Sequence, residues 1–376
     1  MNRSTYSGLG WRTFAVICGA APLAFLGLFF FYPVINIVVS SLSQGLTGFL
    51  GVFESSRTRD AIWFTAWQAA ASTLVTVVIA MPCAALMART SGSAGVWLKA
   101  LVTVPFVLPT IVVGGAFKEL FEGLNGSVGF PNLNHTAGAI IVAHAFFNFA
   151  VVARTVGAYW AGLDHQLEEQ ARTLGSSNSH VFWRVTWPRL KPAVLAAAAI
   201  TFLFSFTSFG VVLVLGGLHQ ATIETEIFRH AVVRGDLAMS ASMSVIQIAV
   251  VLCLVAVTSR LERRTSVSTQ MMRSTIAPMR TTTKTTIAVF SLIFLGSPVV
   301  VMIERSLKAA DSYGLQNYAA LFEKIPQLPT TSAEALGNSM IYASIATAMA
   351  LCLGVVCAMT IVTRRDTVGR FFDLAA

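Results

Sequence analysis

Long apolar runs dominate this chain and leave few folds open to it. A transmembrane helix needs roughly 20 consecutive apolar residues, and a soluble domain carries about 25% charged residues. Only 11% of this sequence is charged. The sequence therefore predicts an all-α integral membrane protein with about eight transmembrane helices. The expected spans are residues 13–39, 61–88, 96–117, 137–159, 193–217, 238–258, 287–303 and 336–362.

The first of these runs is predicted to stay in the mature protein, because it is far longer than the apolar region of a cleaved signal peptide. Basic residues in short loops mark the cytoplasmic side of a membrane protein. With the N-terminus in the cytoplasm, 18 of the 26 Lys and Arg residues fall on that side. We therefore expect a cytoplasmic N-terminus. The net charge of +9 is explained by these basic residues on one side of the membrane. The expected partner is therefore membrane lipid and not nucleic acid.

A polar stretch at residues 160–192, here called the coupling segment, separates the fourth run from the fifth. Its first half has apolar residues at helical spacing, and Gly175 after them predicts a left-handed helix cap. Ser176, Ser177, Asn178 or Ser179 is expected to cap a second short helix, and Pro188 to limit its length. A helix-turn-helix with an unpaired apolar face results. That face is expected to consist of Leu163, Leu167, Ala171 and Leu174.

The coupling segment resembles the cytoplasmic signature of the permease subunits of ATP-binding-cassette (ABC) importers. That signature reads Glu-Ala-Ala, three residues, Gly, nine residues, Ile, one residue, Leu-Pro. The spacing is kept here, with Gln170, Val185 and Trp187 in place of Ala, Ile and Leu. The resemblance implies a type I (MetI-like) importer permease in a bacterial inner membrane. The implied ATPase-coupling residues are Glu169, Gln170, Ala171, Leu174, Gly175, Val185 and Pro188. The alternative is an amphipathic loop lying on the lipid surface.

The same resemblance implies two kinds of partner, an ABC ATPase dimer and an extracytoplasmic solute-binding protein. The sequence has no phosphate-binding Gly-x-x-x-x-Gly-Lys-Ser/Thr loop, so ATP would be bound by the partner. No cofactor and no enzymatic activity are expected of this chain. A secondary transporter would need carboxylates for ion coupling, and none lies centrally in an expected span. A membrane-embedded enzyme would need more than His144.

The seventh and eighth runs look like a second copy of the first two. Residues 61–88 lie on residues 335–362 at a constant shift of 274, and Pro33 matches Pro298. We predict a first permease half at residues 1–262, a linker at 263–286 and an incomplete second half at 287–376. The chain then resembles the fused permeases of the thiamine and ferric-iron branch, interrupted in its second half. The alternative is a natural eight-span protein with a short tail.

Residues 204–217, 221–228 and 105–113 look most like thiamine-type permeases. The resemblance implies an ATP-driven, binding-protein-dependent importer of thiamine. Ferric permeases have similar sequences in these stretches, so import of ferric iron, or of another small solute such as a polyamine, is the alternative.

Polar residues inside the expected spans are candidates for the translocation path. His144 and Asn148 are four residues apart and share a helix face. They could line a cavity or form hydrogen bonds across a helix interface. Ser205, Thr207 and Ser208 are placed at the centre of the fifth span, where small hydroxyl residues could serve either role.

Two other groups of side chains receive a structural interpretation. Glu224 and Glu226 are expected on the outer side, as solvated loop carboxylates or as part of a docking surface for the binding protein. The five cysteines all lie in apolar runs and have no metal-ligand spacing, so they are expected to be packing residues and no metal site is predicted.

Overall fold

The computed structural model describes residues 22, 24–42, 45, 51–124, 132–217, 220–266, 279–309, 312–324, 326 and 329–363. It divides into two compact units, one formed by Ser40–Arg305 and one by Met1–Val39 with Ser306–Ala376. The predicted linker, 263–286, includes residues 267–278, and the predicted second half ends with residues 364–376. Both stretches fall outside the described residues.

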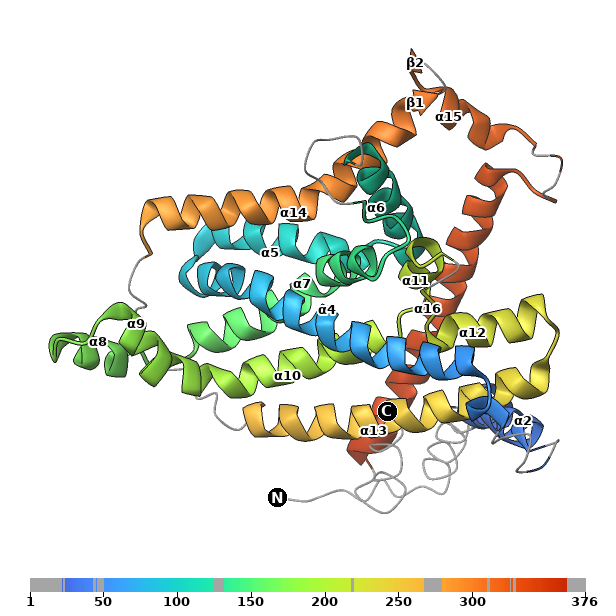
Figure 1. Ribbon diagram of the computed structural model, residues 1–376, viewed down its shortest axis with the longest axis horizontal. Helices are drawn as coiled ribbons and strands as arrows, with labels where there is room; N and C mark the ends of the chain where they lie inside the picture. Colours follow the sequence, from blue (N-terminus) through green and yellow to red (C-terminus); the bar gives the residue numbers. More distant parts are fainter. Residues whose placement is uncertain are drawn as a thin grey trace, which may run out of the picture. The chain divides into compact units, whose positions relative to one another are not determined.

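The prediction of an all-α membrane protein is confirmed by seven described helices that are long and apolar enough to cross a bilayer. The number becomes eight if one bent pair of helices counts as a single span. Figure 1 shows these helices. They are Ala24–Ser41 (which contains η1, Gly27–Phe31, and α2, Tyr32–Ser41), α4 (Ser56–Arg89), α7 (Ala137–Ala161), Asn178–Phe206, α13 (Leu237–Ser266), α14 (Thr281–Leu307) and α16 (Ser332–Thr363).

The third expected span is the bent pair. Proline residues in the sequence predict a kinked helix here, and the structure has two helices, α5 (Gly92–Val107) and α6 (Thr110–Leu124), at 98° to each other. Leu108 adopts an extended conformation with ψ 141°. A residue that precedes proline is pushed out of the helical region, and Pro109 has no N–H to continue the helix.

The fifth expected span differs from the prediction at both ends. Its helix begins at Asn178 and continues through a π-turn, η3 (Phe182–Thr186), into α10 (Trp187–Phe206). Pro188 was expected to limit the preceding helix, and this is wrong. The wide turn satisfies the backbone just ahead of the proline, because the Trp187 N–H donates to the Phe182 carbonyl and Pro188 lies in the first turn of α10.

The other end of that span breaks at residues 207–209, before α11 (Gly210–Leu215). Thr207 and Ser208 therefore do not lie in the middle of a helix, as the sequence predicted. Ser205 is in the last turn of α10. The fifth span, like the third, consists of two helices with a break between them.

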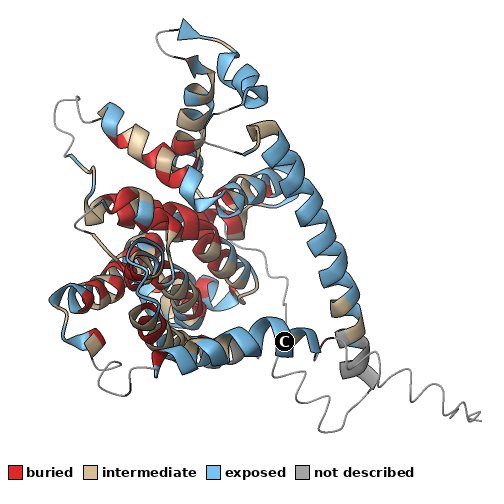
Figure 2. Cartoon of the chain, turned by 90° about the vertical axis from the view of Figure 1, so that its right-hand side faces the viewer, coloured by how far each residue is buried: buried red, intermediate tan, exposed pale blue. Residues whose placement is uncertain are grey.

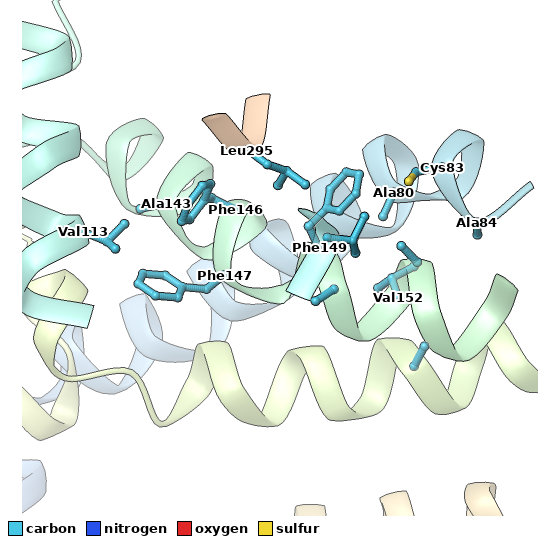
Figure 3. Close-up of a cluster of buried hydrophobic side chains, with 14 of the residues drawn as sticks. Ala80, Cys83, Ala84, Val113, Ala143, Phe146, Phe147, Phe149, Val152 and Leu295 are labelled. Atoms are coloured by element: carbon cyan, nitrogen blue, oxygen red, sulfur yellow. The ribbon is translucent and has the colours of Figure 1, made fainter. Parts of the chain in front are cut away.

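Helix α7 is the centre of the unit formed by residues 40–305. It packs against α4, α5 and α10, and most of its side chains are buried (Figure 2). Figure 3 shows the buried cluster around Phe146, Phe147 and Phe149, which Leu295 of α14 also joins. Helices approach closely where small residues line them: a Cβ on Gly157 would lie 3.1 Å from the Ala84 carbonyl oxygen.

A short helical hairpin packs against the N-terminal part of α4. It consists of α12 (Ile223–Phe228), the π-turn η4 (Arg229–Val233) and the start of α13. The Ile223 N–H donates to the Thr65 hydroxyl of α4 at 3.0 Å. Val52 of the 3₁₀ turn η2 (Gly51–Phe53) forms a small apolar cluster with Ile223 and Met243.

The described residues after 305 form a smaller structure. Two short antiparallel strands, β1 (Lys308–Ala309) and β2 (Ser312–Tyr313), precede α15 (Gln316–Ala319), the 3₁₀ turn η5 (Ala320–Phe322) and α16. No residue in the most apolar part of α16 is buried (Figure 2). The shift of 274 residues carries the range of α4 onto residues 330–363, which is nearly the range of α16.

Candidate functional site

The coupling segment folds as the predicted helix-turn-helix. Helix α8 (Gln166–Thr173) ends at Gly175, which has φ +83°. The Ser176 N–H donates to the Ala171 carbonyl and the Gly175 N–H to the Arg172 carbonyl, the hydrogen-bond pattern of a Schellman cap. Ser177 caps the next helix, α9 (Asn178–Val181), because its hydroxyl accepts from the His180 N–H. The prediction of a left-handed glycine cap is confirmed.

Helices α8 and α9 project beyond the bundle formed by α4, α7 and α10 (Figure 1). Glu169, Gln170 and Gly175 are exposed. Leu167 and Leu174 are exposed by 47% and 86%. The predicted apolar face exists in part: Leu167 and Leu174 are uncovered, whereas Leu163 lies before α8 and packs against the buried core cluster. Of the other signature residues, Ala171 and Val185 are half-buried and Pro188 is exposed.

A buried polar network attaches α8 to the long helix Asn178–Phe206. Glu168 is buried, and its carboxylate accepts from the Thr186 hydroxyl at 2.8 Å. Arg172 donates to the other carboxylate oxygen at 3.4 Å, and the His165 Nδ1 lies 3.4 Å from the first. This network was not predicted from the sequence. The spacing of Glu168 and Arg172 was its only visible signal, since Thr186 lies 18 residues further along the chain.

Aromatic side chains hold the base of α9 against α7. The Phe182 ring lies 6.2 Å from the Trp160 ring and 6.4 Å from the Trp187 ring. The Arg89 guanidinium lies 5.0 Å from the centroid of the Trp160 ring, within range of a cation–π contact. Trp187 occupies the leucine position of the signature, so this departure from the signature contributes to the packing of the junction.

A pocket of about 460 Å³ lies where the two broken spans meet. The sequence analysis singled out His144, Asn148, Thr207 and Ser208, and all four line it. Ser205 does not line it and is fully buried. The remaining lining side chains are mostly aromatic and aliphatic: Phe106, Leu108, Thr110, Ile111, Phe147, Phe204, Phe209 and Val211, together with Gly210.

Hydrogen bonds behind this pocket join α4, α7 and α10. The Ser72 hydroxyl lies 3.2 Å from His144 Nδ1, and the Asn148 amide donates to the Ser205 hydroxyl at 3.2 Å. The Gln68 amide donates to the Ser205 carbonyl at 2.9 Å. His144 and Asn148 therefore fill both roles that the sequence left open, because they line the pocket and bond across helices. Among the described residues, His144 Nε2 has no hydrogen-bond partner.

The two helix breaks are packed closely against each other. A Cβ on Gly210 would lie 2.4 Å from the Thr110 hydroxyl oxygen, and a Cβ on Gly114 would lie 3.1 Å from the Val214 Cβ. Real Cβ atoms are essentially never found at the first of these distances. The start of α11 thus needs a glycine to lie beside the start of α6, and this contact shapes one wall of the pocket.

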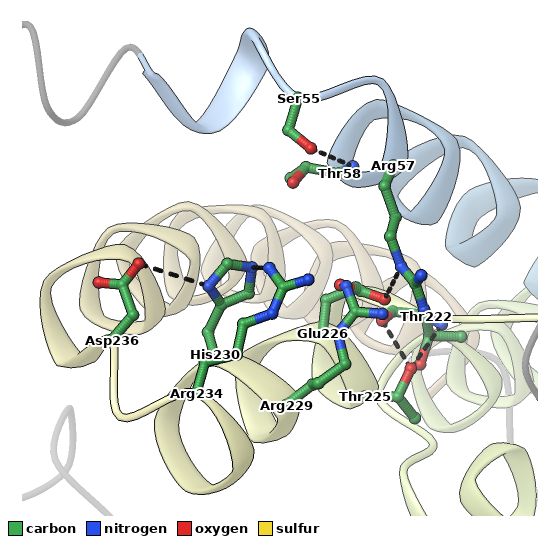
Figure 4. Close-up of polar contacts among 10 residues, drawn as sticks. All are labelled: Ser55, Arg57, Thr58, Thr222, Thr225, Glu226, Arg229, His230, Arg234 and Asp236. Atoms are coloured by element: carbon green, nitrogen blue, oxygen red, sulfur yellow. Dashed lines mark hydrogen bonds and ion pairs between the residues drawn. The ribbon is translucent and has the colours of Figure 1, made fainter.

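Glu224 and Glu226 are not solvated loop carboxylates, so that prediction is wrong. Glu226 is 1% exposed; Arg57 Nε of α4 donates to it at 3.1 Å, and Arg229 forms a second ion pair with it (Figure 4). Glu224 is partly buried and accepts from the Gln247 amide. Burial raises the pKa of Glu224 to about 7. The fold of α12 onto α4 and α13 encloses both carboxylates.

Among the described residues, no group of three or more His, Cys, Asp or Glu side chains could hold a metal ion. The polar groups that come together are the network around Glu168, the bonds behind the pocket and the ion pairs of Glu226.

Comparison with known proteins agrees with this architecture. The profile of the family described as "Binding-protein-dependent transport system inner membrane component" matches residues 77–267, about half of the chain. The chain belongs to this family. It is a multi-pass membrane permease of the binding-protein-dependent ABC importer type, with the helical bundle of type I permeases, and a transport component rather than an enzyme.

Relatives of this permease are named for different solutes. The molybdenum transport system permease protein ModB of Mycobacterium tuberculosis (strain ATCC 25618 / H37Rv) is 29% identical over 217 residues, which are 55% of this chain and 81% of the relative. The thiamine transport system permease protein ThiP of Escherichia coli (strain K12) is 28% identical over 234 residues, 60% of this chain. The match spans 44% of that protein.

The permease also resembles a solved structure. A chain in the crystal structure of a bacterial ABC transporter involved in the import of the acidic polysaccharide alginate superposes with a TM-score of 0.54 at 18% identity. The match covers 68% of this chain and 96% of the other. At this identity the likeness shows the fold alone.

Proposed function

We propose that this permease passes a small solute through the pocket between the two helix breaks, and that an ATPase docked on α8 and α9 drives the movement. One observation carries the proposal: a single helix of 29 residues, Asn178–Phe206, runs from α9 to the pocket. It ends one residue before Thr207, which lines that pocket. A packed helix moves as a unit, so a displacement of α9 would reach the pocket wall.

The exposed face of α8 supports the ATPase as the partner on this side. Leu167 and Leu174 offer apolar contact area, and Glu169 and Gln170 lie beside them. The Glu168–Thr186 hydrogen bond would make α8 and the long helix move together. In this proposal the α8 end of the bundle and the N-terminus face the cytoplasm of a bacterial inner membrane. ATP would be held by the partner dimer, and the permease would need no cofactor.

An extracytoplasmic solute-binding protein would dock at the opposite end of the bundle, where α12 and the start of α4 lie. His144, Asn148, Thr207 and Ser208 would offer polar contacts to the solute during passage, with Ser205 holding Asn148 in place. No Asp or Glu lines the pocket, so coupling of transport to ions through a carboxylate has no support there.

For the solute, we propose thiamine. Four phenylalanine rings line the pocket, and aromatic faces favour an organic cation. The match to ThiP, over 60% of this chain, supports the same choice. An oxyanion is the second candidate, favoured by the match to ModB over 81% of that protein. Ferric iron, the alternative expected from the sequence, would find one imidazole and no carboxylate in the pocket lining.

The test is reconstitution with the ATPase and the solute-binding protein encoded beside the gene. ATPase activity is measured with each binding protein loaded with thiamine, molybdate, sulfate or ferric iron. We expect stimulation by loaded binding protein only, and by thiamine among the four solutes. Stimulation by molybdate or sulfate would replace thiamine with an oxyanion. Uptake that persists without the ATPase would overturn the whole proposal.

A further inference from the structure

A second pocket, of about 550 Å³, lies between α4, α5 and α7 on the side of the bundle that leads to α8. Its walls differ from those of the first pocket, because two cations face it. Lys99 and Thr103 of α5 lie on one side, and Arg154 and Thr155 of α7 on the other. Met87 and Phe106 contribute apolar walls, and none of the described residues that line the pocket is a carboxylate.

Both cations lie inside apolar helices rather than at their ends. Lys99 is seven residues after Gly92, where α5 begins, and Arg154 is seven residues before Ala161, where α7 ends. At a rise of 1.5 Å per residue, each cation is about 10 Å from the end of its helix. The antiparallel course of the two helices brings both cations to the same level of the bundle.

The two cations lack a counter-charge on the described part of the chain. No ion pair there includes Lys99 or Arg154. Arg154 Nη1 donates to the Thr103 hydroxyl at 3.1 Å, and that hydroxyl donates to the Lys99 carbonyl at 2.7 Å. The hydrogen bonds thus orient the guanidinium without neutralising it. Both side chains are exposed, so an anionic group can reach them.

We propose that this pocket binds a phosphate-like oxyanion group, held by Lys99 and Arg154, with the Thr155 hydroxyl on the same wall. Such a group could come from two sources. One is the headgroup of an anionic phospholipid, whose acyl chains would lie along the exposed apolar residues of α5, such as Trp97 and Val104. The other is a free oxyanion such as sulfate. This site adjoins the proposed solute pocket, because Phe106 lines both, but Lys99 and Arg154 line only this one.

The experiment uses the full chain purified in a neutral detergent or in phosphatidylcholine nanodiscs. In one arm, native mass spectrometry measures how much phosphatidylglycerol the protein retains. In the other arm, titration calorimetry measures the binding of sulfate in the absence of anionic lipid. Each arm compares wild type with the double variant Lys99→Gln, Arg154→Gln. A matched control, Arg184→Gln with Lys191→Gln, removes the same charge from two equally exposed positions that lie outside the pocket.

Wild type is expected to bind in at least one arm, and the double variant roughly thirtyfold more weakly, since each cation near an anionic group contributes about fivefold. The control should bind like wild type. Binding in the lipid arm identifies a headgroup site, and binding in the sulfate arm alone identifies a free-oxyanion site. Lys99→Arg should keep the affinity, because it keeps the charge. Equal binding by wild type and the double variant in both arms would overturn the proposal.

Discussion

The two ends of the α4–α7–α10 bundle each bury a glutamate, but they hold it differently. At the α12 end, Glu226 pairs with two arginines, Arg57 from α4 and Arg229 from its own hairpin. At the α8 end, Glu168 accepts from the Thr186 hydroxyl and from Arg172, with His165 beside it. Figure 1 shows the two ends on opposite sides of the bundle.

The α12 end encloses its glutamate among charged partners, whereas the α8 end leaves apolar side chains uncovered. Glu226 joins separate elements through full charges, and the surrounding side chains cover it. Glu168 holds a short helix whose outer face keeps Leu174 86% exposed. Removing one partner of a buried ion pair costs stability, because the other charge is left without a partner. A helix fixed only along its inner side can present its outer side to another protein.

The largest expected effect tests the α8 end. Gly175→Pro should abolish uptake while the protein still inserts, because proline fixes φ near −65° and the cap needs +83°. Charge reversal by Glu169→Lys, at an exposed position, should also uncouple ATP hydrolysis from uptake. Uptake and ATPase activity are measured in parallel on the same reconstituted complex.

The matched control is Gly175→Asn. Asparagine tolerates the left-handed conformation, and nothing lies within 4 Å of a Cβ at this position. It should keep most of the uptake. Equal uptake by the Gly175→Pro and Gly175→Asn variants would show that α8 is not the docking element for the ATPase. The structural difference between the two ends would then have no role in coupling.

The next effect tests the α12 end. Glu226→Ala removes the shared partner of Arg57, whose side chain is 51% exposed, and of Arg229, and should lower the free energy of unfolding by about 3 kcal/mol. Unfolding by denaturant in detergent micelles gives the value. Glu119→Ala is the control: its carboxylate pairs with Arg305 at about 37% exposure, so the loss should stay within about 1 kcal/mol. Equal losses in the two variants would mean that burial does not strengthen the Glu226 contacts.

The Gly175 cap and one of the two helix breaks could be predicted from the sequence, and the other break could not. The cap at Gly175 and the break before Pro109 follow from the residues themselves, since backbone conformation at glycine and proline is decided locally. Thr207 carries no such signal. The break there accompanies the close contact of Gly210 with Thr110, which exists only in the folded chain.

The buried glutamates are hidden from the sequence for the same reason. Glu226 and Arg57 are 169 residues apart, and Glu168 and Thr186 are 18 apart. Neither separation is the three or four residues at which side chains on one helix are neighbours. From the sequence alone, Glu226 reads as a solvated carboxylate in a short polar loop. Only the packing of α12 onto α4 shows that it is buried.

A third effect concerns pH and belongs again to the α12 end. Burial raises the pKa of Glu224 to about 7, above its value in the unfolded chain. The folded state then holds a proton that the unfolded state releases, so stability should fall as pH rises from about 4.5 to about 7, by up to about 3 kcal/mol. Gln247 and Thr222 face this carboxyl with neutral groups.

Denaturation of wild type and Glu224→Gln across this pH range measures that contribution. The glutamine imitates the protonated acid, so the variant should lose this part of the pH dependence while keeping the low-pH stability of wild type. Parallel curves for the two proteins would show that Glu224 is no more enclosed than a surface carboxylate, and that the closed character of this end rests on Glu226 alone.

Among the variants of the buried glutamates, Glu168→Gln should show the smallest change in stability. The amide keeps an acceptor for the Thr186 hydroxyl and loses the charge that faces Arg172, so we expect a loss of about 1–2 kcal/mol. The effect on coupling should be larger than this stability change suggests, because α8 would no longer move rigidly with the long helix. Thr186→Ser retains the hydroxyl and should behave like wild type in both assays, whereas Thr186→Val should resemble Glu168→Gln. A stability loss as large as that of Glu226→Ala, with coupling intact, would make Glu168 a second structural clamp and the two ends alike.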